Sequence, residues 1–145
     1  MSVRCKFRCM SVTRHVDSGT IIEFLPVLAK GKHTPEGSEE NSRFWDATPS
    51  GDVKLTYKPG LDGTRFEVGG YYYIDLLEAG SSQSWKLWEL SQRENSLVVR
   101  LGLGWSYERI LTHAELMLDI HNQGAWAPFQ GKVGTHWTVT FTPCK

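Results

Sequence analysis

The sequence has no excess of charge of either sign, because 16 lysines and arginines balance 16 aspartates and glutamates among 145 residues. A protein that acts by neutralising phosphates usually carries a basic excess, so this balance argues against bulk nucleic-acid binding. No apolar run approaches the roughly 18 residues that cross a bilayer. Residues 1–9 are charged and lack the apolar core of a secretory signal. We therefore expect a protein that is made in a cytoplasm and has no membrane partner.

Cysteine is also scarce, with three residues in the chain. An odd number without a secretory signal does not describe a disulfide framework. Cys5 and Cys9 would lie on one face of a strand but about 13 Å apart along it. Zinc ligands lie about 2.0–2.3 Å from one ion, so this pair could not share a zinc without a bend. Both are predicted to be reduced, buried core residues, and no metal site is predicted.

Catalytic motifs are missing as well. The chain contains no G-x-S-x-G, no H-E-x-x-H and no phosphate-binding loop. Asp119 and His121 stand two apart on a predicted strand and could hydrogen-bond, but such neighbours on a sheet are usually solvated. The sequence therefore predicts no enzyme, no catalytic residue and no cofactor site.

What the sequence does contain is alternation of apolar and polar residues with a period of two. After the turn at Gly69-Gly70, the residues Tyr72, Ile74 and Leu76 face one side of a predicted strand. The same pattern predicts eight strands, at residues 3–12, 20–28, 52–57, 71–77, 85–90, 96–103, 115–120 and 135–142. With 40% hydrophobic residues available for a core, the chain is predicted to be an all-β protein.

Residues 106–120 are ambiguous by themselves, since they also carry helical spacing. The two halves of the chain decide the matter, because they repeat the same order of features. Residues 52–57 resemble residues 115–120, which favours a strand and leaves any helical turn to residues 106–112. Further matches are Lys6-Phe7 with Lys86-Leu87, Leu25 with Leu101, Gly69 with Gly134, and Tyr72, Ile74 and Leu76 with Trp137, Val139 and Phe141.

This repetition predicts one domain built from two duplicated units, residues 1–79 and 83–145. Each four-stranded unit has an apolar face that must be covered to be stable in water. The two faces are therefore expected to pack together as an antiparallel β-sandwich or flattened barrel of about eight strands. Two tandem small β-domains are the alternative.

Aromatic residues make up 12% of the chain. Trp85, Trp137, Tyr72 and Phe7 fit the core, and filling the core of a small sandwich is one explanation for such large side chains; contact with a protein partner is the other. Exposed aromatic side chains are enriched at protein interfaces. The polar, glycine- and proline-rich residues 29–43 are predicted to be a long mobile loop. They could act as an arm that orders on contact with a partner. The candidate partner-contact residues are Phe44, Trp45, Tyr71, Tyr73, Trp88 and Trp126.

One stretch of the first half carries a longer pattern, E-N-x-x-F-W-x-x-T-P-S-G followed by F-x-x-G-x-x-Y-Y-x-D. Here it consists of Glu40-Asn41, Phe44-Trp45, Thr48-Pro49-Ser50-Gly51, Phe66, Gly69, Tyr72-Tyr73 and Asp75. In this pattern the chain resembles a family of small tailed-bacteriophage proteins. The resemblance covers the first half, and the second half matches only through the duplication. It implies a phage setting, with virion proteins as a plausible context, and supplies no active site.

The sequence thus favours a bacteriophage virion protein that decorates or cements the capsid shell. Its partners would be the major capsid protein or other virion proteins, and it could also form a homo-oligomer. One alternative is a phage-encoded binder of a small ligand or host protein that counters bacterial defence. Another is a single-strand nucleic-acid binder that uses a basic strand beside stacking rings. Its residues would be Arg4, Lys6, Arg8, Tyr71 and Tyr73.

Overall fold

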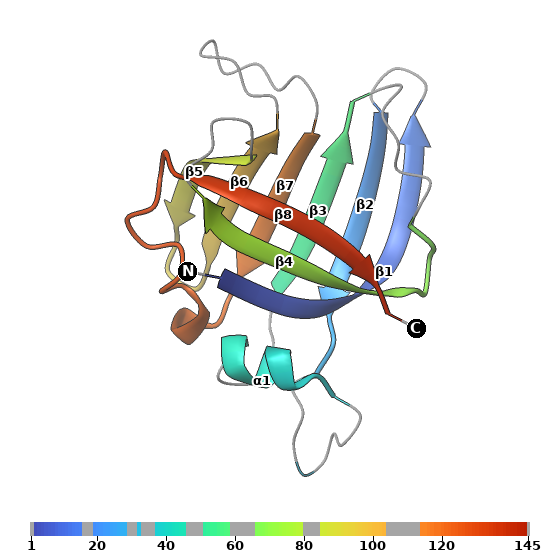
Figure 1. Ribbon diagram of the computed structural model, residues 1–145, viewed down its shortest axis with the longest axis horizontal. Helices are drawn as coiled ribbons and strands as arrows, with labels where there is room; N and C mark the ends of the chain where they lie inside the picture. The colour runs from blue at the N-terminus through green and yellow to red at the C-terminus, as the bar shows by residue number, and fades with distance from the viewer. Residues whose placement is uncertain are drawn as a thin grey trace.

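The chain folds into a closed barrel of eight antiparallel strands, as the computed structural model shows in Figure 1. The structure describes residues 2–15, 19–28, 32, 37–45, 51–58, 66–79, 85–103 and 114–144. The strands are β1 (Ser2–His15), β2 (Gly19–Pro26), β3 (Gly51–Tyr57), β4 (Tyr71–Ala79), β5 (Trp85–Gln92), β6 (Leu97–Leu103), β7 (Ala114–Ile120) and β8 (His136–Pro143). The predicted all-β, flattened-barrel architecture is confirmed.

The barrel is flattened because its long first strand takes part in two layers. The first half of β1 pairs with β4, and its second half pairs with β2. A bulge after Cys9 marks the change, and bulges of this kind bend strands at barrel corners. In Figure 1, β4 and β8 cross in front of β2, β3, β6 and β7 at a steep angle.

The strand order has two-fold character. Around the barrel, β4, β1, β2 and β3 are followed by β7, β6, β5 and β8. Within each half, the fourth strand lies beside the first, and the second and third strands follow the first. This is the strand order of a Greek key. The two halves meet where β3 pairs with β7 and where β4 pairs with β8. Each seam thus joins equivalent strands, as a two-fold axis requires.

The residue pairs at the first seam agree with such an axis. If residues 52–57 correspond to residues 115–120, then Lys54 corresponds to Met117, and these two residues pair directly. Under the same correspondence, Asp52 is equivalent to Glu115 and Asp119 is equivalent to Thr56. The pair Asp52–Asp119 should therefore be repeated as the pair Glu115–Thr56, and both pairs are observed. At the second seam, the match of Ile74 with Val139 makes Asp75 equivalent to Thr140, and these two residues also pair directly. The registers are therefore those expected of two copies of one four-stranded unit.

A glycine turn holds β1 and β5 in the same manner in both halves. The Gly69 N–H donates to the Cys9 carbonyl over 2.8 Å, and the Gly134 N–H donates to the Leu87 carbonyl over 2.7 Å. Both glycines have positive φ angles, 86° and 95°, which only glycine adopts without strain. The match of Gly69 with Gly134 thus corresponds to a shared backbone geometry.

The registers correct the sequence match between the first strands of the two halves. The bulge in β1 follows Cys9 and the bulge in β5 follows Leu87, so these two residues are equivalent. Phe7 then corresponds to Trp85, whereas the sequence match assigned it to Leu87. A shift of two residues keeps the same side chains inward, so alternation could not reveal it.

The match of Leu25 with Leu101 is wrong by one residue. Leu25 is exposed on the barrel wall, whereas Leu101 is fully buried. The counterpart of Leu101 is Phe24, because Phe24 pairs with Cys9 as Leu101 pairs with Leu87. A slip of one residue exchanges the two faces of a strand, and burial shows which register is right.

The barrel interior is filled by side chains, as is usual for eight strands. Inward residues include Trp137, Phe7, Phe24, Phe129 and Ile22, all nearly or fully buried. Among the described residues, one interior void beside Trp45 and Phe129 measures about 10 Å³. A space of that size holds at most about one water molecule. This void is therefore too small for a small ligand.

A helix lies at one end of the barrel, where the sequence predicted only a mobile loop. The helix α1 (Glu39–Trp45) packs against β1 and the short helix η1 (Gln123–Ala125), as Figure 1 shows. The Asn41 N–H donates to the Ser38 hydroxyl over 3.2 Å, which caps its first turn. The loop prediction, which covered residues 29–43, is therefore wrong for residues 39–43. A helix this short gains most of its stability from packing, which composition does not report.

Residues 114–120 form β7, so the choice of strand for this segment is confirmed. Two predicted features lie outside the described residues. They are the possible helical turn at residues 106–112 and most of the junction between the two predicted units, at residues 79–82. In the part of the chain that the structure describes, no helix is long and apolar enough to cross a membrane.

Candidate functional site

Two surfaces on the outer wall of the barrel combine charge with exposed apolar atoms. The first lies on β1 and β4, where outward side chains of the two strands face each other. The Arg4 guanidinium carbon lies 4.0 Å from the centre of the Tyr73 ring. The Lys6 ammonium lies 5.5 Å from the Tyr71 ring and 6.0 Å from the Tyr73 ring. We call this surface the aromatic–basic strip; it consists of Arg4, Lys6, Arg8, Tyr71 and Tyr73.

The cations of the strip already have partners within the protein. The Arg4 Nε atom lies 3.2 Å from a carboxylate oxygen of Asp75, which is the cross-strand neighbour of Arg4. Cations on rings stabilise exposed sites by about 0.5–1 kcal/mol each. The strip is therefore an ordered surface in which rings and cations hold one another in place.

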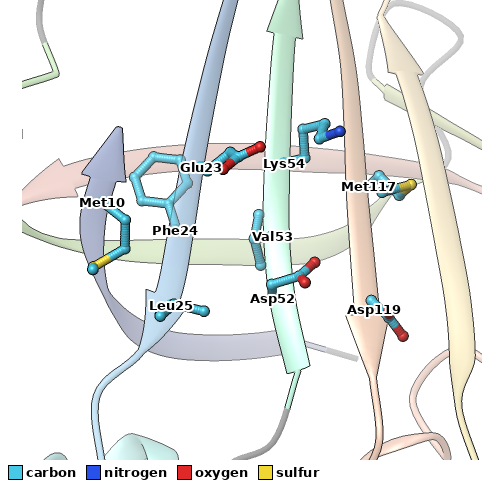
Figure 2. Close-up of a pocket in the computed structure, with 9 residues that line it drawn as sticks. All are labelled: Met10, Glu23, Phe24, Leu25, Asp52, Val53, Lys54, Met117 and Asp119. Carbon is cyan, nitrogen blue, oxygen red and sulfur yellow. The ribbon is translucent and has the colours of Figure 1, made fainter. Parts of the chain in front are cut away.

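The second surface is a groove across β2, β3 and β7, with Met10 of β1 at one side (Figure 2). Its volume is about 350 Å³. Figure 2 shows Met10 and Met117 on opposite sides, with Asp52 on β3 between them and Asp119 on the same strand as Met117. The groove is lined by Met10, Glu23, Phe24, Leu25, Asp52, Val53, Lys54, Met117 and Asp119.

Negative charge dominates the groove. Asp52 and Asp119 stand directly opposite each other on β3 and β7, and like charges in this position are destabilising. Burial and the Asp119 carboxylate raise the pKa of Asp52, and Glu23 adds to the effect; His121 and Lys54 oppose it. Among the residues that the structure describes, no lysine or arginine forms an ion pair with Glu23, Asp52 or Asp119. The His121 Nε2 atom lies 3.5 Å from a carboxylate oxygen of Asp119.

The two-fold equivalent of the groove contains an arginine. There Arg100 takes the position that Glu23 has in the first half, since Glu23 pairs with Ser11 as Arg100 pairs with Glu89. The Arg100 guanidinium lies 2.8 Å from Glu89 and 3.0 Å from Glu115. Its carbon also lies 5.7 Å from the Trp88 ring. Arg100 therefore neutralises Glu89 and Glu115 in the second half, whereas Asp52, the counterpart of Glu115, has no such arginine beside it among the described residues of the first half.

The candidate partner-contact residues fall into two groups. Tyr71 is 44% exposed, and Tyr73 and Trp88 are half-buried on the outer wall. Trp45 and Trp126 are only 3% and 6% exposed. Trp126 donates its indole N–H to the Ile120 carbonyl over 2.9 Å. These two tryptophans thus belong to the core at the α1 end, and the side chain of Phe44 lies outside the described residues.

Cys5 and Cys9 are free thiols that point into the core, as predicted. Burial raises the pKa of Cys5 well above its usual value, with further contributions from Asp75 and Glu40. Within the described ranges, no group of three or more histidine, cysteine and acidic residues is arranged to hold a metal ion. Asp119 lines the groove, and His121 lies beside it, as the sequence suggested.

Sequence reasoning missed the groove. Its acidic residues are spread over three strands that are distant in sequence, and their proximity depends on the pairing of β3 with β7. One signal was present, because the match of residues 52–57 with residues 115–120 implies that the seam strands are equivalent. It did not reveal that these strands pair with each other, which is what places Asp52 opposite Asp119.

Fold and surfaces together define a closed antiparallel β-barrel with a packed interior and two charged surfaces on its outer wall. Comparison of the chain with protein-family models, curated proteins and solved structures finds no match.

Replacing Asp52 with asparagine is expected to raise the free energy of unfolding at pH 7, by less than about 1 kcal/mol because solvent screens this exposed side chain. The pKa of Asp52 is raised by folding, so its contribution to stability is present below the unfolded pKa and is lost as pH rises through the folded pKa. The advantage of the variant should therefore vanish below about pH 3.5, where both states are protonated.

Urea denaturation at pH 7 and pH 3 measures this difference. Asp75→Asn is the matched control, because Asp75 faces Arg4 and its loss should not stabilise the protein. A lower stability of the Asp52 variant at pH 7 would contradict the electrostatic explanation.

Proposed function

We propose that the chain is a bacteriophage virion structural protein that decorates the capsid shell by binding across neighbouring capsid subunits. Its role is passive: a rigid barrel bridges subunits and strengthens the shell through contacts on its outer wall. Repetition at many equivalent sites lets modest individual affinities add up. The phage setting rests on the sequence pattern that includes Glu40-Asn41 and Tyr72-Tyr73.

The observation that carries this proposal is the aromatic–basic strip. Tyr71 presents nearly half of its surface to solvent from a strand hydrogen-bonded on both sides. Tyrosine and arginine are the residues most enriched at energetically important interface positions. Because the strip is held rigid by its own ring–cation contacts, little conformational entropy is lost when a partner binds.

The filled interior argues against a small-ligand carrier. The barrel core is occupied by Trp137, Phe129 and their neighbours, so binding is expected on the outer wall. A host-protein binder would use the same wall. It differs from a decoration protein in copy number, because a shell component is present in many copies per particle.

Single-strand nucleic-acid binding is the second candidate, since the strip combines stacking rings with cations. Its phosphate affinity is reduced by the ion pair between Arg4 and Asp75. Fluorescence anisotropy with a labelled oligonucleotide tests this function. Binding that weakens steeply with salt would favour it over the decoration role.

Quantitative mass spectrometry of purified virions tests the main proposal. We expect many copies of the wild-type protein per particle. The double variant Tyr71→Ala/Tyr73→Ala should be absent from the particles, whereas the control variant Thr138→Ala, on the neighbouring exposed wall, should be retained. Absence of the wild-type protein from virions would refute the decoration role. Retention of the tyrosine variant at the wild-type level would show that the strip is not the contact surface.

A further inference from the structure

The groove and its two-fold equivalent differ in one respect that suggests a ligand. In the second half, Arg100 lies between Glu89 and Glu115, beside the Trp88 ring. In the first half, the corresponding strands β2 and β3 carry Glu23 and Asp52. A third carboxylate, Asp119, lies opposite Asp52 on the neighbouring strand β7. Of the two carboxylates that contact Arg100, Glu115 has an acidic counterpart in Asp52, whereas the counterpart of Glu89 is Ser11. The position of Arg100 itself is taken by Glu23, so the described lining of the groove has carboxylates and lacks the guanidinium.

We propose that the groove binds an arginine side chain presented by the partner protein, with a contact to Asp52 that matches the contact of Arg100 with Glu115 in the second half. The guanidinium would lie against the carboxylates of Asp52 and Asp119, and its aliphatic stem would run between Met10 and Met117. That the partner is a protein of the shell rests on the proposed function. The affinity of the groove for arginine does not depend on it.

The dimensions and chemistry of the groove fit this ligand. A volume of about 350 Å³ exceeds that of one long side chain and leaves room for the main chain that carries it. The exposed side chain of Leu25 and the two methionines provide apolar walls for the stem, and methionine adapts its shape to irregular partners. The groove carries three carboxylates against the single ammonium of Lys54, which gives charge complementarity with a cation.

Arginine is favoured over lysine for a geometric reason. Two carboxylates on adjacent strands present acceptors side by side, and the planar guanidinium donates to two acceptors at once. A lysine ammonium is a compact point charge that is more strongly hydrated. Arg100 makes a double contact in the same barrel, with one nitrogen near Glu89 and another near Glu115, on the two strands that flank its own.

Titration of the isotopically labelled protein with N-acetyl-arginine amide, followed by amide NMR shifts, tests the proposal. We expect saturable shifts at Asp52, Lys54 and Asp119, with a dissociation constant in the millimolar range. The citrulline analogue has the same shape without the charge and should bind about tenfold more weakly or not at all. The lysine analogue should fall between the two. Equal shifts with arginine and citrulline would overturn the proposal.

Variants provide the second arm of the experiment. Asp52→Asn and Asp119→Asn should each weaken arginine binding by about tenfold, whereas Asp75→Asn on the opposite wall should leave it unchanged. Glu23→Arg places a guanidinium where the second half has Arg100. It should raise the melting temperature and abolish binding of the added arginine. If Glu23→Arg binds the probe as well as wild type, the groove is not the site.

Sedimentation velocity distinguishes a partner protein from a second copy of this chain. The wild-type protein is expected to sediment as a monomer under the conditions of the titration. Self-association that Asp52→Asn abolishes would identify a second copy as the occupant and overturn the assignment to a separate partner. Failure of the NMR titration would refute the groove without affecting the virion proposal, because the titration uses purified protein alone.

Discussion

Replacing Trp137 with alanine is expected to lower the free energy of unfolding by about 3–5 kcal/mol. Trp137 is fully buried in the barrel, and its ring centre lies 5.6 Å from that of Phe129. Its indole N–H donates to the Thr135 hydroxyl over 2.8 Å. The substitution would therefore leave a large cavity where β8 pairs with β5 and remove one hydrogen bond to the Thr135 hydroxyl, which would still donate to the Lys132 carbonyl.

Chemical denaturation followed by far-ultraviolet circular dichroism measures this loss. Trp137→Phe should cost distinctly less than Trp137→Ala, since most of the ring volume is retained. Thr138→Ala, on the next and outward-facing residue, should change stability by less than about 0.5 kcal/mol. A loss below about 1 kcal/mol for Trp137→Ala would mean that the barrel core is packed differently.

Replacing Asn41 with alanine is expected to cost about 3 kcal/mol, although Asn41 lies in a seven-residue helix. The Asn41 side chain is fully buried and acts as an extra strand residue beside β1. Its Oδ1 accepts the Lys6 N–H over 2.7 Å, and its Nδ2 donates to the carbonyls of Lys6 and Val27 over 2.9 and 2.6 Å. Alanine would leave the Lys6 N–H and the Val27 carbonyl without these bonds.

Each buried group that loses its partner costs about 1–3 kcal/mol, which is the basis of the expected magnitude. Asn41→Asp is the sharper variant, because a carboxylate would face two carbonyl oxygens at neutral pH. Its loss should be at least as large as that of alanine. Asn95→Ala, the same substitution at an exposed turn, is the matched control. Hydrogen exchange should show the Lys6 amide losing protection in the Asn41 variants and keeping it in the control.

The Asn41 network also accounts for the error over α1. Residues 29–43 have the composition of a loop, and nothing local distinguishes Asn41 from a solvated polar residue. Its three side-chain hydrogen bonds go to backbone atoms of Lys6 and Val27, which are distant in sequence. Burial of Trp45 against the barrel then fixes the helix end. Both interactions are tertiary, so the sequence pattern could not report them.

The burial of Trp126 illustrates the same limit. A tryptophan in a polar turn reads as exposed, yet its indole N–H bonds to the end of β7 and its ring closes the barrel. The exposure of Tyr71 was predicted correctly, because it lies in a regular strand where alternation assigns each residue to a face. Prediction thus succeeded inside strands and failed in the segments between them.

The sequence by itself determined the positions of the strands and their inward faces, because a period of two depends only on local geometry. It also contained the repetition of one four-stranded pattern. Only the tertiary structure decided that β3 pairs with β7 and β4 with β8, since pairing between distant strands depends on how two complete units close into one barrel. That closure places Asp52 opposite Asp119 and leaves the first half of the barrel without the arginine that its second half contains.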